Sequence, residues 1–122
     1  MSLRILAIDD SLTMREMLRQ TLTEAGFDVM LAEDGIDGLA QLPDVAPDLI
    51  LTDLNMPNMD GFGLIEAVRK GDIAPRVPIL VLTTESATTL KERARQAGAT
   101  GWITKPFDEQ SLVSTIRRVA AV

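Results

Sequence analysis

The residues of this chain best suited to chemistry are carboxylates, a hydroxyl and a lysine that each follow a short aliphatic run. Asp9 and Asp10 follow the first such run, and Asp53 follows the third. Thr83 and Lys105 follow the fourth and the fifth. If the runs are parallel strands, their carboxyl ends meet at one edge of a sheet, where open α/β folds bind ligands. We therefore expect these side chains to converge on one small region.

The chemistry of such a group of side chains points to a metal ion and a phosphoryl group. Three carboxylates repel one another unless a cation compensates their charge. Hard divalent cations prefer oxygen ligands, and Mg²⁺ usually keeps waters and phosphate oxygens beside one or two carboxylates. An ammonium such as Lys105 and a hydroxyl such as Thr83 suit the oxygens of a phosphoryl group. Asp53, which ends the predicted central strand, is the best candidate for a nucleophile that forms an aspartyl phosphate.

The composition excludes several other kinds of chemistry. The 122 residues predict one domain over residues 1–122, and they contain no Cys and no His. Thiolate nucleophiles, Cys-based zinc sites and imidazole bases are therefore excluded. With 12 Lys and Arg against 18 Asp and Glu, the net charge is −6, which argues against direct binding of nucleic acid.

The elements that must position these residues follow from hydrophobic periodicity. Short, continuously apolar runs alternate with amphipathic stretches, which predicts an α/β fold with helices on both faces of a parallel sheet. Pro43 is expected to close the second helix. The apolar runs, about five residues long, are too short to span a membrane, and the N-terminus lacks a signal peptide, so we expect a cytoplasmic protein. The predicted strands are 4–8, 29–32, 49–52, 79–82 and 101–104, and the predicted helices are 12–25, 35–42, 61–70, 88–97 and 108–120.

Two related functions fit the residues less well. A phosphatase of the haloacid-dehalogenase type needs a second Asp two residues after the nucleophile, but Asn55 stands there, and an amide cannot shuttle a proton. A phosphoryl group on Asp53 would therefore be held for a time. A dinucleotide or flavin domain needs a phosphate-binding loop after the first strand, where Asp9 and Asp10 would repel a phosphate.

Taken together, these motifs resemble those of two-component response-regulator receiver domains. The chain is most similar to the stand-alone, CheY-like chemotaxis kind over essentially its whole length. The resemblance implies a doubly wound, flavodoxin-like sheet of five parallel strands in the order 2-1-3-4-5 with five helices. The motifs that carry it are Asp9-Asp10-Ser11, Asp53-Leu54-Asn55-Met56-Pro57, Met59-Asp60-Gly61, Thr83 and Lys105-Pro106-Phe107.

The resemblance also implies a phosphoacceptor and a metal site. Asp53 would accept the phosphoryl group. Asp10 and Asp53 would bind Mg²⁺ through their side chains, and the backbone carbonyl of Asn55 would be a third protein ligand. Asp9 would act through a bound water.

Further residues would sense the phosphoryl group. Lys105 would contact it, with a cis bond to Pro106, and Thr83 would move to hydrogen-bond it. Trp102 stands where the family has a switch aromatic, usually Tyr or Phe, so its coupling to Thr83 could differ in detail. Thr84 replaces the usual Ala or Gly, and we expect its larger side chain to narrow access to Asp53.

The implied function is that of a phosphorelay switch, not an enzyme with a separate substrate. The chain would promote its own phosphotransfer and slow dephosphorylation, with a phosphohistidine of a sensor histidine kinase as donor. Phosphorylation would change the surface of the fourth helix, fifth strand and fifth helix, which a downstream protein such as a flagellar switch protein would bind. A phosphatase is a further candidate partner, and we expect a monomer without membrane contact. Two alternatives are a receiver domain trimmed from a longer regulator and a pseudo-receiver scaffold that is never phosphorylated.

Overall fold

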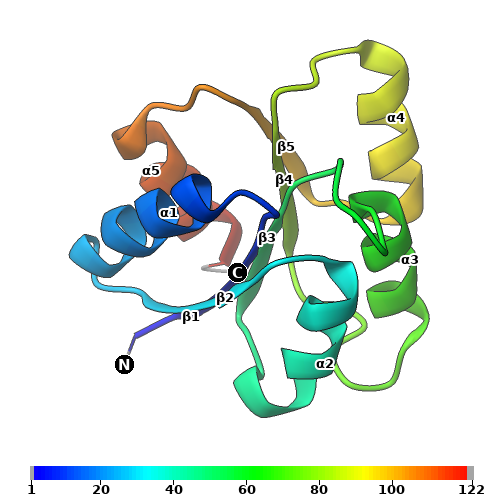
Figure 1. The fold of residues 1–122 in the computed structure, drawn as a ribbon, viewed down its shortest axis with the longest axis horizontal. Helices are drawn as coiled ribbons and strands as arrows, with labels where there is room; N and C mark the ends of the chain where they lie inside the picture. The colour runs from blue at the N-terminus through cyan, green and yellow to red at the C-terminus, as the bar shows by residue number, and fades with distance from the viewer. Residues whose placement is uncertain (1, 121–122) are drawn as a thin grey trace.

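The chain folds around one parallel sheet. A computed structural model describes residues 2–120 and has five parallel strands in the order β2-β1-β3-β4-β5 (Figure 1). This order and the five helices confirm the predicted doubly wound fold. The strands are β1 (Arg4–Ile8), β2 (Asp28–Ala32), β3 (Leu49–Thr52), β4 (Ile79–Thr83) and β5 (Gly101–Thr104). The helices are α1 (Leu12–Glu24), α2 (Gly35–Val45), α3 (Gly61–Lys70), α4 (Thr88–Ala97) and α5 (Glu109–Ala120).

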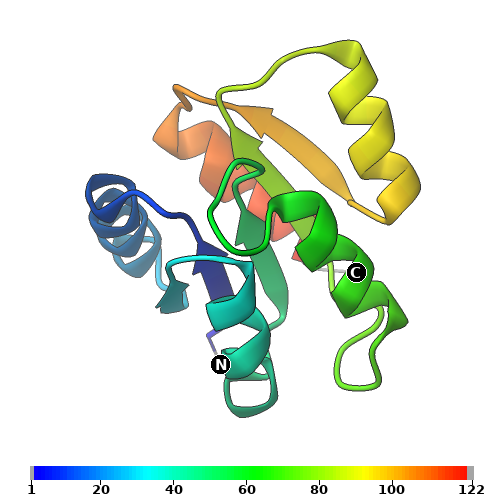
Figure 2. The ribbon, with the colours of Figure 1, turned by 45° about the vertical axis from the view of Figure 1, so that its right-hand side comes forward.

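The helices cover both faces of the sheet because alternate strand residues point to opposite sides. Ile5 and Leu49 face the layer formed by α1 and α5, whereas Leu6 and Ile50 face the layer formed by α2, α3 and α4. The two helical layers stand on either side of the strands in Figures 1 and 2. Burial on both faces explains why the central strands are continuously apolar. Within residues 2–120, no helix is both long enough and apolar enough to cross a lipid bilayer.

The second helix is longer than the sequence predicts. We expected Pro43 to end it at Leu42, but α2 continues to Val45 and ends at Ala46, whose φ of 47° is left-handed. The Ala46 N–H donates to the Leu42 carbonyl at 3.0 Å, which completes the last turn. The side chains of Leu42 and Val45 are both buried in the core, and this packing outweighs the cost of a proline in the final turns.

The fourth helix buries few of its side chains. Ala94 is the only buried residue of α4. Its N-cap residue, Ala87, has no side chain that could bond the free N–H groups of the first turn. In contrast, the side chains of Ser11 and Asp60 cap α1 and α3. We therefore infer that α4 is held less firmly than α1 and α3.

Candidate functional site

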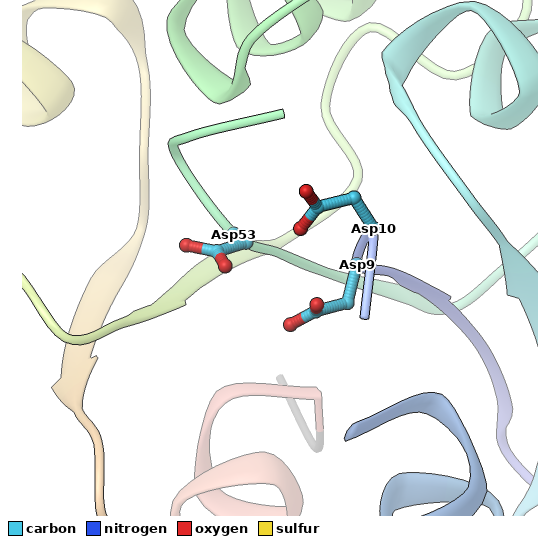
Figure 3. Close-up of side chains that lie close together, drawn as sticks. All are labelled: Asp9, Asp10 and Asp53. Carbon is cyan, nitrogen blue, oxygen red and sulfur yellow. The ribbon is translucent and has the colours of Figure 1, made fainter. Parts of the chain in front are cut away.

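Three carboxylates meet at the carboxyl ends of β1 and β3. One oxygen from each of Asp9, Asp10 and Asp53 lies within 4.8 Å of the others. Figure 3 shows Asp10 and Asp9 projecting from the end of β1 toward the same space as Asp53 from β3. Asp9 is buried, Asp53 is partly buried and Asp10 is exposed, so the cluster opens to solvent on the side of Asp10.

Local hydrogen bonds orient two of these carboxylates. One oxygen of Asp9 accepts the Ser11 N–H at 2.9 Å, and one oxygen of Asp53 accepts the Leu54 N–H at 2.7 Å. The Asp53 N–H continues the sheet by donating to the Ile8 carbonyl at 3.0 Å. Both side chains are thus fixed by the first residues after their strands, which leaves a second oxygen of each for other contacts.

Lys105 occupies the position between these second oxygens. Its Nζ lies 2.8 Å from Asp9 Oδ2 and 3.1 Å from Asp53 Oδ2, and its side chain is only 9% exposed. Burial lowers the pKa of Lys105, but the bonds and charges of the two carboxylates outweigh burial and raise the pKa above its ordinary value. The Lys105 N–H donates to the Thr83 carbonyl at 2.7 Å, and the bond to Pro106 is cis, as expected. The ammonium group is therefore held charged beside Asp53.

Thr83 and Trp102 lie on neighbouring strands and are linked through Glu85. Thr83 is fully buried, and its hydroxyl accepts the Glu85 N–H at 3.4 Å. The Trp102 indole N–H donates to the Glu85 carbonyl at 3.1 Å, while the Asn55 amide donates to the Glu85 side chain at 3.5 Å. Thr84, expected to narrow access to Asp53, is exposed.

Sequence reasoning missed two residues that support the site. Glu85 joins Asn55 to Trp102, and Arg15 of α1 donates to the Asp9 carbonyl at 2.7 Å. Glu85 lies in an irregular loop, where periodicity gives no signal. Arg15 lies one turn into α1, and helical side chains tilt toward the N-terminal end of their helix. This position could have indicated that Arg15 contacts the end of β1.

The donor set of this site fits Mg²⁺. All three clustered side chains offer oxygen, the ligand type that this ion prefers. Mg²⁺ also retains several waters, and the exposure of Asp10 leaves space for them. The arrangement can hold a divalent cation and a phosphoryl group side by side, because Lys105 adds positive charge next to Asp53 while Asp10 remains open to solvent.

Comparisons with known proteins point to one family. The sequence profile described as response regulator receiver domain matches residues 5–117. Protein PilH of Pseudomonas aeruginosa is 36% identical, over 97% of this chain and 98% of PilH. The transcriptional regulator RpaA of Synechocystis is 36% identical over 93% of this chain, but the chain spans only 47% of RpaA.

Solved structures give the same result. Chemotaxis protein CheY4 of Vibrio cholerae is 41% identical with a TM-score of 0.93, over 98% of this chain and 99% of CheY4. The receiver domain of sensor histidine kinase PA1611 of Pseudomonas aeruginosa is 27% identical with a TM-score of 0.91, over 100% of both chains. That structure contains a magnesium ion coordinated in the active site cleft.

Proposed function

The chain belongs to the response regulator receiver domain family, and from this premise we propose that Asp53 accepts a phosphoryl group from a phosphohistidine of a sensor histidine kinase. Receiver domains are signalling switches that bind Mg²⁺ at an acidic site. The observation that carries the proposal for this chain is the contact of Lys105 with Asp53 beside three clustered carboxylates. We assign Asp10, Asp53 and the Asn55 carbonyl as Mg²⁺ ligands, with Asp9 acting through a water.

The proposed transfer moves one group between two proteins. An Asp53 oxygen forms a bond to phosphorus while the phosphorus–nitrogen bond to the kinase imidazole breaks, and the imidazole leaves with the bonding electrons. When bound, Mg²⁺ supplies positive charge beside the carboxylates and phosphoryl oxygens. We expect Lys105, which contacts Asp53, to contact the same oxygens, and the Thr83 hydroxyl to donate a hydrogen bond to one of them.

The phosphorylated state is expected to persist. Hydrolysis needs a group that activates water, and Asn55 is an amide where a carboxylate would be required. The partly buried position of Asp53 also limits the approach of water. The domain therefore promotes its own phosphotransfer and slow dephosphorylation, and a separate phosphatase could shorten the signal.

The output is a change in the α4–β5–α5 face. A phosphoryl group adds roughly one to two negative charges and attracts the Thr83 hydroxyl. Movement of Thr83 and the β4–α4 loop then changes the environment of Trp102, whose indole bonds that loop at Glu85. Phosphorylation shifts the population between two conformations by the difference in its interaction energy with them. The weak attachment of α4 makes it the element that responds most readily.

The similarity to chemotaxis protein CheY4 supports a chemotaxis-type role, and the match over 98% of PilH supports residues 1–122 as one receiver domain. We propose that it acts as a cytoplasmic monomer and binds a downstream protein, such as a flagellar switch protein. The match to RpaA, of which the chain spans 47%, keeps the second candidate, a receiver domain of a longer regulator. Both candidates require phosphorylation of Asp53, whereas a pseudo-receiver scaffold does not.

Phosphotransfer profiling tests the proposed donor. Purified sensor kinases carrying labelled phosphohistidine are mixed with the wild type and with Asp53→Asn in the presence of Mg²⁺. We expect one kinase to label the wild type faster than the others do, and none to label the variant. Labelling of neither protein by any kinase or by acetyl phosphate would establish the scaffold alternative instead.

A second experiment tests the switch. Beryllofluoride, a phosphoryl mimic, is added with Mg²⁺ while the fluorescence of Trp102, the single tryptophan, is recorded. We expect a change in the wild type and none in Asp53→Asn. A flat signal in the wild type would remove Trp102 from the switch without affecting phosphorylation itself.

A further inference from the structure

The loop between β3 and α3, residues 53–60, lies beside the start of α2. This loop carries the Asn55 carbonyl that we assign to Mg²⁺, and Figures 1 and 2 both place it next to the first turn of α2. The Gly61 N–H donates to the Leu54 carbonyl at 2.9 Å and closes the base of the loop. The conformation of the rest of the loop depends on the contacts made by its tip, at residues 58 and 59.

Asp34 connects the loop to α2. One oxygen of its carboxylate accepts the Asp37 N–H at 2.8 Å and caps the helix, and the other accepts the Asn58 amide at 2.7 Å. Asp34 is only 6% exposed, although it lies outside the carboxylate cluster of the metal site. Both of its oxygens therefore have defined partners, and one partner is the tip of the loop.

A second contact fixes the same end of the loop. The Gly35 N–H donates to the Met59 carbonyl at 3.3 Å, and a Cβ at position 35 would lie 2.7 Å from Met59 Cγ. Asn58 itself has a left-handed φ of 68°, which asparagine adopts more readily than most residues. The tip is therefore held in one conformation by a helix that is anchored in the core at Leu42 and Val45.

We propose that Asp34 and Asn58 are positioning residues for the Mg²⁺ site. Their hydrogen bond restricts the β3–α3 loop, which carries the Asn55 carbonyl, to one conformation before the ion binds. Without this bond the loop would have to be ordered during binding, and the lost conformational entropy would reduce the affinity. The inference rests on the proposed function, because that function assigns the Asn55 carbonyl to the metal.

Two single substitutions break the bond without disturbing the helix. Asn58→Gly removes the amide but keeps the left-handed conformation accessible, at an exposed position. Asp34→Ser keeps an N-cap side chain but is too short to reach Asn58. Asp44→Ser, at an exposed position of α2, is the control for the loss of one negative charge.

Calorimetric titration of the metal-free proteins with Mg²⁺ measures the effect. We expect Asn58→Gly and Asp34→Ser to bind Mg²⁺ about tenfold more weakly than the wild type, the lower end of the range for residues that orient metal ligands. Hydrogen exchange of the backbone amides of residues 55, 56 and 58–60 should become faster in both variants. Asp44→Ser should leave both the Mg²⁺ affinity and the exchange rates of these amides close to their wild-type values. Unchanged Mg²⁺ affinity in Asn58→Gly would overturn the inference.

The exchanged pair separates positioning from simple packing. In the double variant Asp34→Asn with Asn58→Asp, the net charge is that of the wild type. The new amide side chain at position 34 can cap α2 through its oxygen while its nitrogen donates to the carboxylate at position 58. We expect the Mg²⁺ affinity of this variant to return toward the wild-type value. A loss of Mg²⁺ affinity as large as that of Asn58→Gly would contradict the positioning role of Asp34 and Asn58.

Phosphorylation of the wild type, by the sensor kinases or by acetyl phosphate, keeps the two claims apart. If it fails while the Mg²⁺ affinities differ as expected, the positioning role stands and the proposed function is wrong. If phosphorylation succeeds while the Mg²⁺ affinities are equal, the proposed function stands and the positioning role is wrong.

Discussion

At the scale of single residues, Lys105 balances the charge of the carboxylate cluster. It contacts Asp9 and Asp53 together, and the side chains of all three are largely withdrawn from water. Charges in such a place are favourable only while they are paired, since removal of one partner leaves the other without compensation. The same lysine therefore stabilises the metal-free protein and, in our proposal, contacts the phosphoryl group.

Replacing Lys105 with methionine should reveal both roles. We expect Lys105→Met to lower the free energy of unfolding without Mg²⁺ by about 2 kcal/mol, somewhat less than for a fully buried pair because the site opens to solvent. Added Mg²⁺ should restore more stability in the variant than it adds to the wild type, while phosphorylation slows. Urea unfolding with and without Mg²⁺ measures this, with Lys91→Met on the exposed face of α4 as the control. Equal stability of Lys105→Met and the wild type without Mg²⁺ would contradict the role in charge balance.

At the scale of elements, α4 differs from the other helices in how it begins. Ala87 offers no capping side chain, and the helix buries one residue against the core. Free N–H groups in the first turn then depend on water, which favours local opening. A helix of this kind can move at little cost when the β4–α4 loop rearranges.

Supplying the missing cap should make α4 more rigid. Ala87→Ser is expected to stabilise the helix by about 0.5 to 1 kcal/mol, since serine at the N-cap bonds an N–H of the first turn. Hydrogen exchange of the first amides of α4 should slow in proportion. Thr89→Ser, already inside the helix, provides the control. Exchange in Ala87→Ser as fast as in the wild type would show that the lack of a cap does not limit the stability of α4.

The elements also show what could be predicted from the sequence. The strand cores and the arrangement of Asp9, Asp53 and Lys105 were predictable, because each residue directly follows an apolar run and parallel strands end at one edge. The extension of α2 beyond Pro43 was not, since it depends on tertiary packing of Val45. The bond between Asp34 and Asn58 joins two irregular loops 24 residues apart, and no periodic pattern marks either one.

At the scale of the whole molecule, the net charge of −6 is not spread evenly over the fold. Part of the acidic excess is gathered at one end of the sheet, where Asp9, Asp10 and Asp53 share a small volume. The sequence contains no histidine, so in our proposal the phosphohistidine donor lies outside these 122 residues. In the same proposal the chain contributes the acceptor and an oxygen-only metal site.

Mg²⁺ should therefore stabilise the folded protein as a whole. At a concentration about 100 times its Kd, a ligand that binds only the native state adds about 2.7 kcal/mol. We expect this gain for the wild type and a much smaller one for Asp10→Ala, which without the ion loses only a carboxylate that repels Asp9 and Asp53. Thermal unfolding against MgCl₂, with NaCl at equal ionic strength as the control, measures the gain. An equal gain in Asp10→Ala would place the ion elsewhere.

The central claim, that Asp53 is the phosphoacceptor, is tested most directly by intact-protein mass spectrometry after incubation with acetyl phosphate. We expect the wild type to gain the mass of one phosphoryl group in the presence of Mg²⁺ and to lose that gain when the ion is chelated. Asp53→Asn, which keeps the size of the side chain, should gain nothing under either condition. A Mg²⁺-dependent gain that persists in Asp53→Asn would contradict the account.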